Sequence, residues 1–357
     1  MSSESTASAS RYHPLRVRAV VEETHDTKSI EFDVPAALAE QFRYRPGQFL
    51  TLRLPIEGKY VPRCYSMSSA PSLDEGLRVT VKRVHQGRGS NWVCDKLRSG
   101  DTVELLPPSG LFSPKDLSQN FLLLAGGSGI TPVFSILRTV LKEHQGKVVL
   151  LYANRDEKSV IFKTALRELA SQYPDRLQVV HWLDSVQGAP SQQQLSVWAK
   201  PWVGQSGQAF ICGPGPFMDA AQQAMIDAGM PAEQVHVERF ASLPDEETLQ
   251  QMQQASAANA EAPVVSEATV QLRLDGQDYE FSCNGSETIL EAGLRAGINV
   301  PYSCQAGMCA SCMCQVQEGS VTMRHNEVLD AKDLAKRWTL ACQSVPTSET
   351  LRVKFPE

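Results

Sequence analysis

The sequence lacks the features that would direct it to a membrane or to nucleic acid. Its apolar runs, such as Phe121 to Ala125, fall far short of the roughly 18 residues that a membrane span requires. Lysine and arginine form no cluster along the 357 residues, and the formal net charge is −6. Phosphate binding needs clustered positive charge. We therefore expect no membrane span and no nucleic-acid partner, and we expect a monomer.

Other absences further limit the class of protein and its location. Residues 1–10 have neither the cationic start nor the apolar stretch of a secretion signal. They are interpreted as a disordered lead, and we expect the protein to be cytoplasmic. The chain contains no Ser-His-Asp arrangement, and its seven histidines have no metal-ligand spacing. We take the histidines as surface or packing residues.

Short β-rich runs and then strand–helix alternation predict two domains in the first two thirds of the chain. In residues 11–115 the runs carry alternating apolar residues and are separated by Pro and Gly, which is typical of an antiparallel β-barrel. In residues 116–244 apolar strands alternate with helices expected at Pro132–Glu143 and Ser159–Gln172. That alternation predicts a Rossmann-like parallel sheet.

A linker and a third domain follow. Residues 245–267 are rich in Gln, Ala, Ser and acids and are predicted to be a tether. In residues 268–357 a hairpin signal at Asp275-Gly276 precedes a helix expected at Glu287–Ala296 and then a cysteine-rich loop. This order is typical of a β-grasp fold, so the chain is predicted to combine α/β and α+β domains.

Four of the nine cysteines have the spacing of an iron–sulfur site. Cys304, Cys309 and Cys312, with Cys342 some thirty residues further on, match C-x4-C-x2-C…C, the plant-type ferredoxin pattern. Small residues between them permit a tight loop around a two-iron, two-sulfur cluster. The alternative is structural zinc, but zinc sites usually contain two short cysteine pairs and one is missing here. The remaining thiol in this region, Cys314, is predicted to be buried.

In its cysteine spacing and its order of domains, the chain resembles a known family. Residues 268 to 357 look like a plant-type ferredoxin domain, and the two preceding domains look like the ferredoxin–NADP reductase superfamily. Together they resemble reductase components of multicomponent oxygenases with the ferredoxin domain at the C-terminus. The resemblance implies FAD, chosen over FMN, together with a 2Fe-2S cluster and NADH or NADPH as electron donor.

The string Arg63-Cys-Tyr-Ser66 is similar to the flavin motif R-x-Y-S of that superfamily. The resemblance implies that Arg63 pairs with a flavin phosphate, that Tyr65 packs against the isoalloxazine and that Ser66 hydrogen-bonds near N5. Each residue type suits its role, because a guanidinium binds phosphate oxygens, a phenol ring is flat and a hydroxyl both donates and accepts. Ser66 is therefore our first candidate catalytic residue.

A second flavin stretch resembles the superfamily's G-x-x-S sequence that opens a helix beneath the flavin phosphates. Gly87 and Gly89 would let the backbone approach the phosphates. Ser90 is expected to cap a helix whose N-terminal amides attract anions. The alternative is an ordinary capped helix, but two flavin motifs in the right order make that alternative the weaker one.

The string Gly126-Gly-Ser-Gly-Ile-Thr-Pro132 resembles the nicotinamide motif G-G-[ST]-G-[IV]-[TA]-P. Gly127 and Gly129 would form a turn after a strand. Thr131 is expected to cap the following helix and Pro132 to occupy its first turn, so that pyrophosphate would meet free amides. These four residues are predicted to bind the cofactor.

Two further motifs resemble the nicotinamide half of the superfamily. Cys212, Gly213 and Pro214 match a C-G-P turn whose cysteine lies beside the nicotinamide. Glu238 and Phe240 match E-x-[FY], in which the acid lies near the hydride path and the aromatic near the flavin. Cys212 and Glu238 are thus candidate catalytic residues, and Gly213, Pro214 and Phe240 candidate cofactor contacts.

Arg155 follows a predicted strand, and we assign it to the cofactor site. It would either grip a 2′-phosphate and favour NADPH, or pair with the pyrophosphate of NADH, or lie in solvent. Asp156 beside it weakens the NADPH case. The choice between the two nicotinamides stays open at the level of sequence.

The three predicted domains explain one another. A nicotinamide gives two electrons as hydride, a two-iron cluster carries one, and a flavin can hold either number. The chain is therefore predicted to be an NAD(P)H-dependent reductase that passes single electrons to a terminal oxygenase by transient docking. The resemblance points to an oxygenase of the 3-ketosteroid 9α-hydroxylase or phenylacetyl-CoA epoxidase type.

Other acceptors and other classes of protein remain as alternatives. Within the same class, the acceptor would be a desaturase, a hybrid-cluster protein or a haem protein. From different classes, the chain would be a redox-sensing iron–sulfur flavoprotein without turnover, or a colourless zinc-stapled adaptor.

Overall fold

The computed structural model describes residues 12–239, 251, 265–329 and 331–356. The chain forms two compact units, the first holding most of the residues up to Arg239 and the second holding the C-terminal residues. The predicted lead at residues 1–10 and most of the predicted linker lie outside the described residues. None of the described helices is long and apolar enough to cross a membrane.

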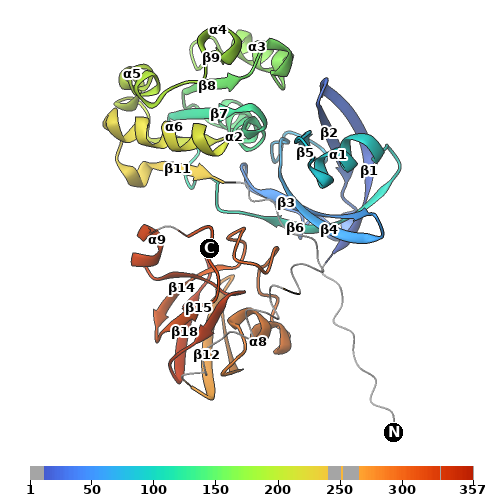
Figure 1. Cartoon of the computed structure of the whole chain (residues 1–357), viewed down its shortest axis with the longest axis vertical. Helices are drawn as coiled ribbons and strands as arrows, with labels where there is room; N and C mark the ends of the chain where they lie inside the picture. The colour runs from blue at the N-terminus through green and yellow to red at the C-terminus, as the bar shows by residue number, and fades with distance from the viewer. Residues whose placement is uncertain (1–11, 240–250, 252–264, 330, 357) are drawn as a thin grey trace. The chain divides into compact units, whose positions relative to one another are not determined.

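The first unit begins with a six-stranded sheet in the order β4-β3-β6-β1-β2-β5 (Figure 1). The strands are β1 (His13–Thr24), β2 (Thr27–Asp33), β3 (Phe49–Ile56), β4 (Lys59–Ser66), β5 (Leu77–Lys82) and β6 (Thr102–Ser109). β1 pairs antiparallel with β2 and β6, and β2 pairs antiparallel with β5. A bridge between Met67 and Val79 links the two ends of this order, which agrees with the predicted barrel.

Alternation of apolar residues explains the interior of this barrel. In β2, Ile30 and Phe32 are fully buried while Glu31 between them is half-buried, as expected when successive side chains point to opposite faces. β3 is apolar on most positions and buries Leu50 and Leu52. The helix α1 (Arg88–Lys96) follows β5 and buries Val93 and Cys94.

The second half of the first unit is a parallel sheet in the order β11-β10-β7-β8-β9. Its strands are β7 (Phe121–Gly126), β8 (Val148–Asn154), β9 (Leu177–Leu183), β10 (Gln208–Cys212) and β11 (Val235–Glu238). β7 and β8 are buried throughout, which is why they are continuous apolar runs in the sequence. The predicted Rossmann-like sheet is confirmed.

Helices cover both faces of this sheet (Figure 1). They are α2 (Ile130–Glu143), α3 (Lys163–Gln172), α4 (Asp184–Gln187), α5 (Gln192–Val203) and α6 (Gly215–Asp227). Side chains of α2 and α3 share one apolar core with one face of the sheet, and side chains of α5 and α6 share a second core with the other face. The strand order reverses between β7 and β10, and the crevice at such a point is where α/β sheets bind ligands.

The C-terminal unit is a five-stranded sheet in the order β13-β12-β18-β14-β16, with a separate β15–β17 pair. Its elements are β12 (Glu267–Leu274), β13 (Gln277–Asn284), α8 (Ile289–Arg295), β14 (Met313–Glu318), β15 (Val321–Met323), α9 (Ala331–Ala335), β16 (Trp338–Leu340), β17 (Ser344–Pro346) and β18 (Thr350–Lys354). The predicted hairpin forms at Asp275 and Gly276, both with positive φ. The first strand lies parallel to the last, β12 to β18, in agreement with the predicted β-grasp order.

Two helices begin later than the sequence predicts. The helix expected from Ser159 starts at Lys163, because Phe162 has a left-handed backbone (φ 57°) and Asp156 accepts from the Ser159 amide to cap a separate 3-10 turn. The helix expected from Glu287 starts at Ile289, because Thr288 and Glu291 form a capping box there. The first correction arises from the backbone turn at Phe162 and the second from a side-chain cap.

Gly47 tests how closely the barrel packs on the segment that leads from it toward the parallel sheet. A Cβ at Gly47 would lie 1.9 Å from the Phe112 carbonyl oxygen, whereas a Cβ at Gly100 would have open space, and both glycines have φ +94°. Gly47→Ala and Gly100→Ala therefore share the backbone strain, and only Gly47→Ala adds a clash of about 1–3 kcal/mol. We expect Gly47→Ala to unfold about 2–12 °C below Gly100→Ala in a thermal scan. Equal unfolding temperatures would contradict the close packing.

Candidate functional site

The proposed flavin residues lie together at the end of β4. Ser66 is buried, and within the described part of the chain its Oγ has no hydrogen-bond partner. An unpaired buried hydroxyl costs about 1–3 kcal/mol, so this oxygen fits a site whose partner is a bound group. Burial also raises the pKa of the neighbouring Tyr65 phenol, so that ring is neutral. These two observations fit a flavin ring at this strand end.

The start of α1 faces the side chain of Arg63. A Cβ at Gly89 would lie 2.7 Å from Arg63 Cγ, so glycine is needed for the arginine stem to pass. The first amides of α1 have no partners within the helix. Together with the guanidinium they form a place suited to an anion, which fits the phosphates of a flavin nucleotide.

The expected role of Ser90 as a helix cap is wrong. The residue before α1 is Gly87, which makes no side-chain cap, and Ser90 is the third residue of the helix. Ser90 Oγ instead accepts a hydrogen bond from the Val84 amide at 3.1 Å. A Cβ at Gly87 would lie 2.7 Å from that oxygen. The serine therefore holds the turn that leads into the helix and leaves the helix amides available.

Two glycine turns meet at the reversal point of the parallel sheet. A Cβ at Gly129 would lie 2.0 Å from the Cys212 carbonyl oxygen and 2.6 Å from the Gly213 nitrogen. A Cβ at Gly126 would lie 2.9 Å from Pro214. The loop after β7 and the loop after β10 can approach this closely only because these positions lack side chains. This close contact places both predicted nicotinamide motifs in one crevice.

Thr131 does not cap α2 as expected. The capping position is Gly129, and Thr131 is the buried second residue of the helix, with its Oγ1 donating to the Ser128 carbonyl at 3.2 Å. The short 3-10 turn Gly127–Gly129 runs directly into the helix and moves its start toward the glycines. Pro132 lies in the first turn, where its missing N–H leaves no bond unmade.

Cys212 and Glu238 are neighbours on adjacent strands. They are register partners of β10 and β11, and Cys212 is also the partner of Ala125 in β7. Cys212 is fully buried, and burial together with the Glu238 carboxylate raises the pKa of its thiol well above the usual range. The sulfur is therefore a neutral thiol, suited to packing and positioning. Phe240, the third predicted residue of this group, lies outside the described residues.

Arg155 lies in a place that the sequence did not predict. Its Nη2 donates to Asp26 of the barrel at 2.9 Å and lies 3.5 Å from Ser159 Oγ, and about two thirds of its side chain is exposed. The two residues are 129 positions apart, so no local signal in the sequence could indicate the pair. Asp26 balances the arginine charge and joins the barrel to the end of β8.

The four predicted cluster cysteines form two pairs. The Cys304 amide lies 3.4 Å from Cys309 Sγ, and the Cys342 amide lies 3.5 Å from Cys312 Sγ. No group of three or more His, Cys, Asp or Glu side chains among the described residues is placed to hold a single metal ion. Two sulfur pairs suit two iron atoms, whereas a zinc site needs all of its ligands around one ion.

The backbone of the cysteine loop is shaped around these sulfurs. Gln305, Gly307 and Ala310 all have left-handed φ values between 52° and 72°. The amides of Ala306 and Met308 each lie 3.4 Å from Cys304 Sγ, so the loop turns its donors toward sulfur. Non-glycine residues adopt this conformation at a cost of order 1–3 kcal/mol. That cost, and the inward amides, fit a loop that wraps an iron–sulfur cluster.

The remaining buried thiols are separate from this site. Cys314 is fully buried in β14, and burial raises the pKa of its thiol. Cys283 is fully buried as well and donates to the Glu287 carbonyl, with its pKa raised to about 12, first by burial. Both are neutral packing residues, and the burial predicted for Cys314 is confirmed.

Gln343 is a cluster-site residue that sequence reasoning missed. It is buried directly after Cys342, its Nε2 donates to the Gln305 carbonyl at 2.8 Å, and the same nitrogen lies 3.8 Å from Cys342 Sγ. A side-chain amide has two N–H donors, so one group can serve both acceptors. Gln343 thus ties the cysteine loop to the fourth sulfur.

Comparisons with known proteins agree with the three predicted domains. The model of the oxidoreductase FAD-binding domain matches residues 14–113, that of the oxidoreductase NAD-binding domain residues 123–223, and that of the 2Fe-2S iron–sulfur cluster binding domain residues 272–347. The fold and the sites define a class of protein, an NAD(P)H-dependent oxidoreductase that uses FAD and a 2Fe-2S cluster.

Relatives along the whole chain define the family. The ferredoxin reductase component of 3-ketosteroid-9-alpha-monooxygenase from Rhodococcus rhodochrous is 50% identical over 342 residues, which are 96% of each chain. A 1,2-phenylacetyl-CoA epoxidase subunit from Escherichia coli is 35% identical over 96% of this chain and 98% of its own. The chain belongs to the family of reductase components of oxygenases.

A solved structure has the same arrangement of domains along the chain. Phthalate dioxygenase reductase matches with a TM-score of 0.56 and 24% identity, over 96% of this chain and 98% of its own. At that identity the likeness concerns the fold alone. It supports the predicted combination of a barrel, a parallel sheet and a β-grasp domain.

Gly129 is expected to be essential for nicotinamide binding. Gly129→Ala would force the two glycine turns apart at a cost of about 1–3 kcal/mol, so the KM for the nicotinamide should rise roughly tenfold. Gly215→Ala is the control, because a Cβ there at the start of α6 would meet nothing within 4 Å. Steady-state dye reduction measures both variants. A similar KM in both variants would show that Gly129 is not needed for nicotinamide binding.

Gln343 is expected to raise the reduction potential of the cluster. Its N–H near Cys342 Sγ stabilises the extra negative charge of the reduced state. Gln343→Leu removes about 0.5–1.5 kcal/mol of hydrogen bonding and should lower the midpoint by roughly 20–60 mV. Redox titration followed by EPR measures the shift. Gln317→Leu, an exposed glutamine of β14, should leave the midpoint unchanged.

Proposed function

We propose that this chain takes hydride from NADH or NADPH and delivers single electrons to a terminal oxygenase of the 3-ketosteroid 9α-hydroxylating type. The observation that carries the proposal is the similarity along the whole chain to reductase components of that monooxygenase. Three such relatives, from Rhodococcus rhodochrous, Mycolicibacterium smegmatis and Mycobacterium tuberculosis, are 45–50% identical to it. The related epoxidase protein is 35% identical.

The first group of residues binds the flavin. A bound flavin accepts two electrons together from a nicotinamide and releases them one at a time. In the proposal, Arg63 and the first amides of α1 bind the flavin phosphates, while Tyr65 and Ser66 orient its ring. Ser66 donates its unpaired hydroxyl to the flavin near N5.

The nicotinamide is held by the second group of residues. Gly127, Gly129 and the start of α2 receive the pyrophosphate, and Gly213 and Pro214 close the other side of the crevice. Cys212, as a neutral thiol, packs beside the nicotinamide ring. Because the thiol is buried, it excludes water from this edge of the nicotinamide ring. The hydride is therefore not lost to a proton from water during transfer.

The four cysteine sulfurs would hold the 2Fe-2S cluster, from which single electrons leave the protein. Cys304 with Cys309 would bind one iron and Cys312 with Cys342 the other. We propose that the domain bounded by residues 268 and 357 docks transiently on the oxygenase. That segment carries eleven acidic residues against eight basic ones, so a basic patch on the partner is expected. A cytoplasmic monomer without nucleic-acid contacts completes the proposal.

An absorption spectrum and a coupled assay test this function. The purified protein should show flavin and cluster bands that bleach with anaerobic NAD(P)H. Mixed with a 3-ketosteroid 9α-hydroxylating oxygenase, it should support formation of hydroxylated steroid. If an epoxidase, a desaturase or a haem protein is reduced faster than the steroid oxygenase, the proposed acceptor is wrong. If NAD(P)H leaves the flavin oxidised, the proposed reductase activity itself is wrong.

Cys342→Ala separates the two halves of the electron path. The variant should lose the cluster's EPR signal and lower product formation by the oxygenase at least 100-fold, while NAD(P)H still reduces the flavin. Cys314→Ala is the matched control, because Cys314 is another buried thiol of this domain and lies outside both sulfur pairs. An intact cluster in Cys342→Ala would show that the fourth ligand is another residue.

A further inference from the structure

The segment between β4 and β5, residues 67–76, begins directly after the proposed flavin residue Ser66. Backbone and side-chain hydrogen bonds fasten it to β5. The Ser68 amide donates to the Arg78 carbonyl at 2.7 Å, and Ser68 Oγ lies 2.7 Å from Thr80 Oγ1 in the buried interior. The Arg78 amide donates to Ser69 Oγ at 3.0 Å. This segment is therefore held firmly to the barrel.

The outer face of α2 docks on the same segment. Ser135 Oγ donates to the Ser69 carbonyl at 2.6 Å, and both serines are fully buried. One turn further along the helix, Arg138 donates through both terminal nitrogens to the two oxygens of Asp74, at 2.5 and 2.9 Å. Residues three or four apart lie on one face of a helix. The helix is thus attached to the barrel at two successive turns.

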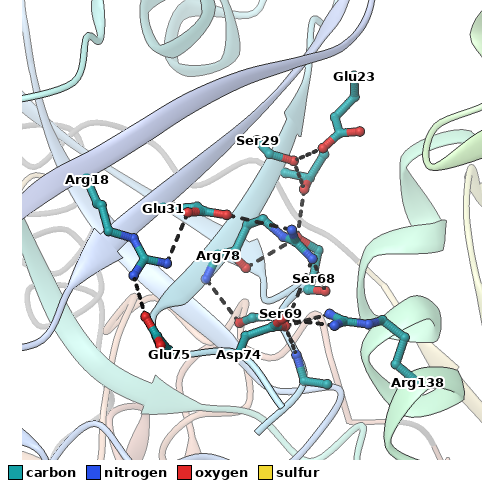
Figure 2. A network of polar contacts seen from close by, with 12 residues as sticks. Arg18, Glu23, Ser29, Glu31, Ser68, Ser69, Asp74, Glu75, Arg78 and Arg138 are labelled. Atoms are coloured by element: carbon teal, nitrogen blue, oxygen red, sulfur yellow. Dashed lines mark hydrogen bonds and ion pairs between the residues drawn. The ribbon is translucent and has the colours of Figure 1, made fainter. Parts of the chain in front are cut away.

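Asp74 is the centre of this polar network (Figure 2). Its Oδ2 also accepts from the Ala70 amide at 2.8 Å and lies 4.0 Å from Arg78 Nη2. Burial would raise the pKa of the Asp74 carboxyl, but the hydrogen bonds from Arg138 and Ala70 outweigh burial, so the pKa is lowered. The side chains of Asp74 and Arg138 are only about a quarter and a fifth exposed, and both are charged.

A partly buried ion pair of this kind is a costly way to gain stability, because desolvation offsets much of the attraction. Its particular advantage is geometric. A bidentate arginine–carboxylate pair fixes direction as well as distance. Arg138 lies eight residues beyond the start of α2, about 12 Å along the helix, and Asp74 lies eight residues beyond Ser66. The pair therefore connects the helix that begins at the nicotinamide loop to the strand that ends at the flavin residue.

We infer that Asp74 and Arg138 are positioning residues for hydride transfer, holding the nicotinamide loop Gly126–Pro132 at a fixed distance and angle from Ser66. The inference rests on the proposed assignment of those two places to nicotinamide and flavin. Neither side chain touches the reacting atoms. Weakening the pair loosens α2 on the barrel, so bound nicotinamide reaches the reactive geometry less often while its own contacts with the glycine loop remain.

Rapid mixing of the complete, cofactor-loaded protein with NADH or NADPH under anaerobic conditions tests the inference. Asp74→Asn should lower the limiting rate constant of flavin reduction about tenfold or more, with the Kd for the nicotinamide changed less than threefold. The flavin content and flavin spectrum should stay unchanged. Arg138→Lys keeps the charge without the two-point geometry and should lower the same rate constant by a smaller factor. This second variant serves if Asp74→Asn fails to fold.

One control variant separates positioning from general stability. Glu104→Gln breaks a pair of comparable exposure, in which Arg53 of β3 donates to Glu104 of β6 at 3.0 Å within the barrel, and it should leave the limiting rate unchanged. If the pair only stabilised the fold, its loss would lower the unfolding temperature. It would not lower the rate constant of flavin reduction while leaving the Kd for the nicotinamide nearly unchanged.

The outcomes are distinguishable from failure of the proposed function. An unchanged limiting rate in both Asp74→Asn and Arg138→Lys overturns the inference. So does an equal loss in Glu104→Gln, or a fall in rate that only follows a loss of bound flavin. If the unmodified protein is reduced by neither nicotinamide, the proposed function fails first, and the positioning role fails with it.

Discussion

The missing side chain at Gly129 governs the geometry at the carboxyl edge of the parallel sheet. The loop after β7 and the carbonyl of Cys212 approach so closely that even a methyl group would lie 2.0 Å from the oxygen. Because of this contact, α2 begins at the reversal point of the strand order, where α/β sheets bind their ligands. The place of α2, and therefore its docking on the barrel, depends on this one constraint.

The same helix connects two domains that have no strand in common. Its first turn belongs to the proposed nicotinamide site. Its inner face contributes Ile136 and Leu137 to the sheet's core, and its outer face carries Ser135 and Arg138 to the barrel. A rigid helix of 14 residues thus couples the loop proposed to bind one cofactor to the strand end proposed to bind the other. Relative placement of two cofactors is the main demand that hydride transfer makes on a protein.

At both proposed cofactor sites the polypeptide alone is in an unfavourable state. Ser66 buries a hydroxyl that has no partner among the described residues, and the cysteine loop holds Gln305 and Ala310 in left-handed conformations. Each feature costs on the order of 1 kcal/mol or more. Bound groups that accept the hydroxyl's hydrogen bond or take the sulfur ligands offset these costs. Binding and local folding are therefore linked at the two sites.

The sequence by itself determined the three folds, because strand alternation and glycine turns are read within a few residues. The same short-range reading proposed three of the cluster sulfurs through the pattern C-x4-C-x2-C. The expected caps at Ser90 and Thr131 were wrong, since a residue type favours a cap but the local hydrogen-bond partners decide it.

Only the tertiary structure decided which distant side chains meet. The partners Asp26 and Arg155, Asp74 and Arg138, and Gln305 and Gln343 are 129, 64 and 38 residues apart. No spacing rule links such positions, because their contact follows from how a helix or loop packs after the sheets have formed. The residue types that carry the chemistry can therefore be predicted from the sequence, while the orientation of their side chains depends on long-range packing.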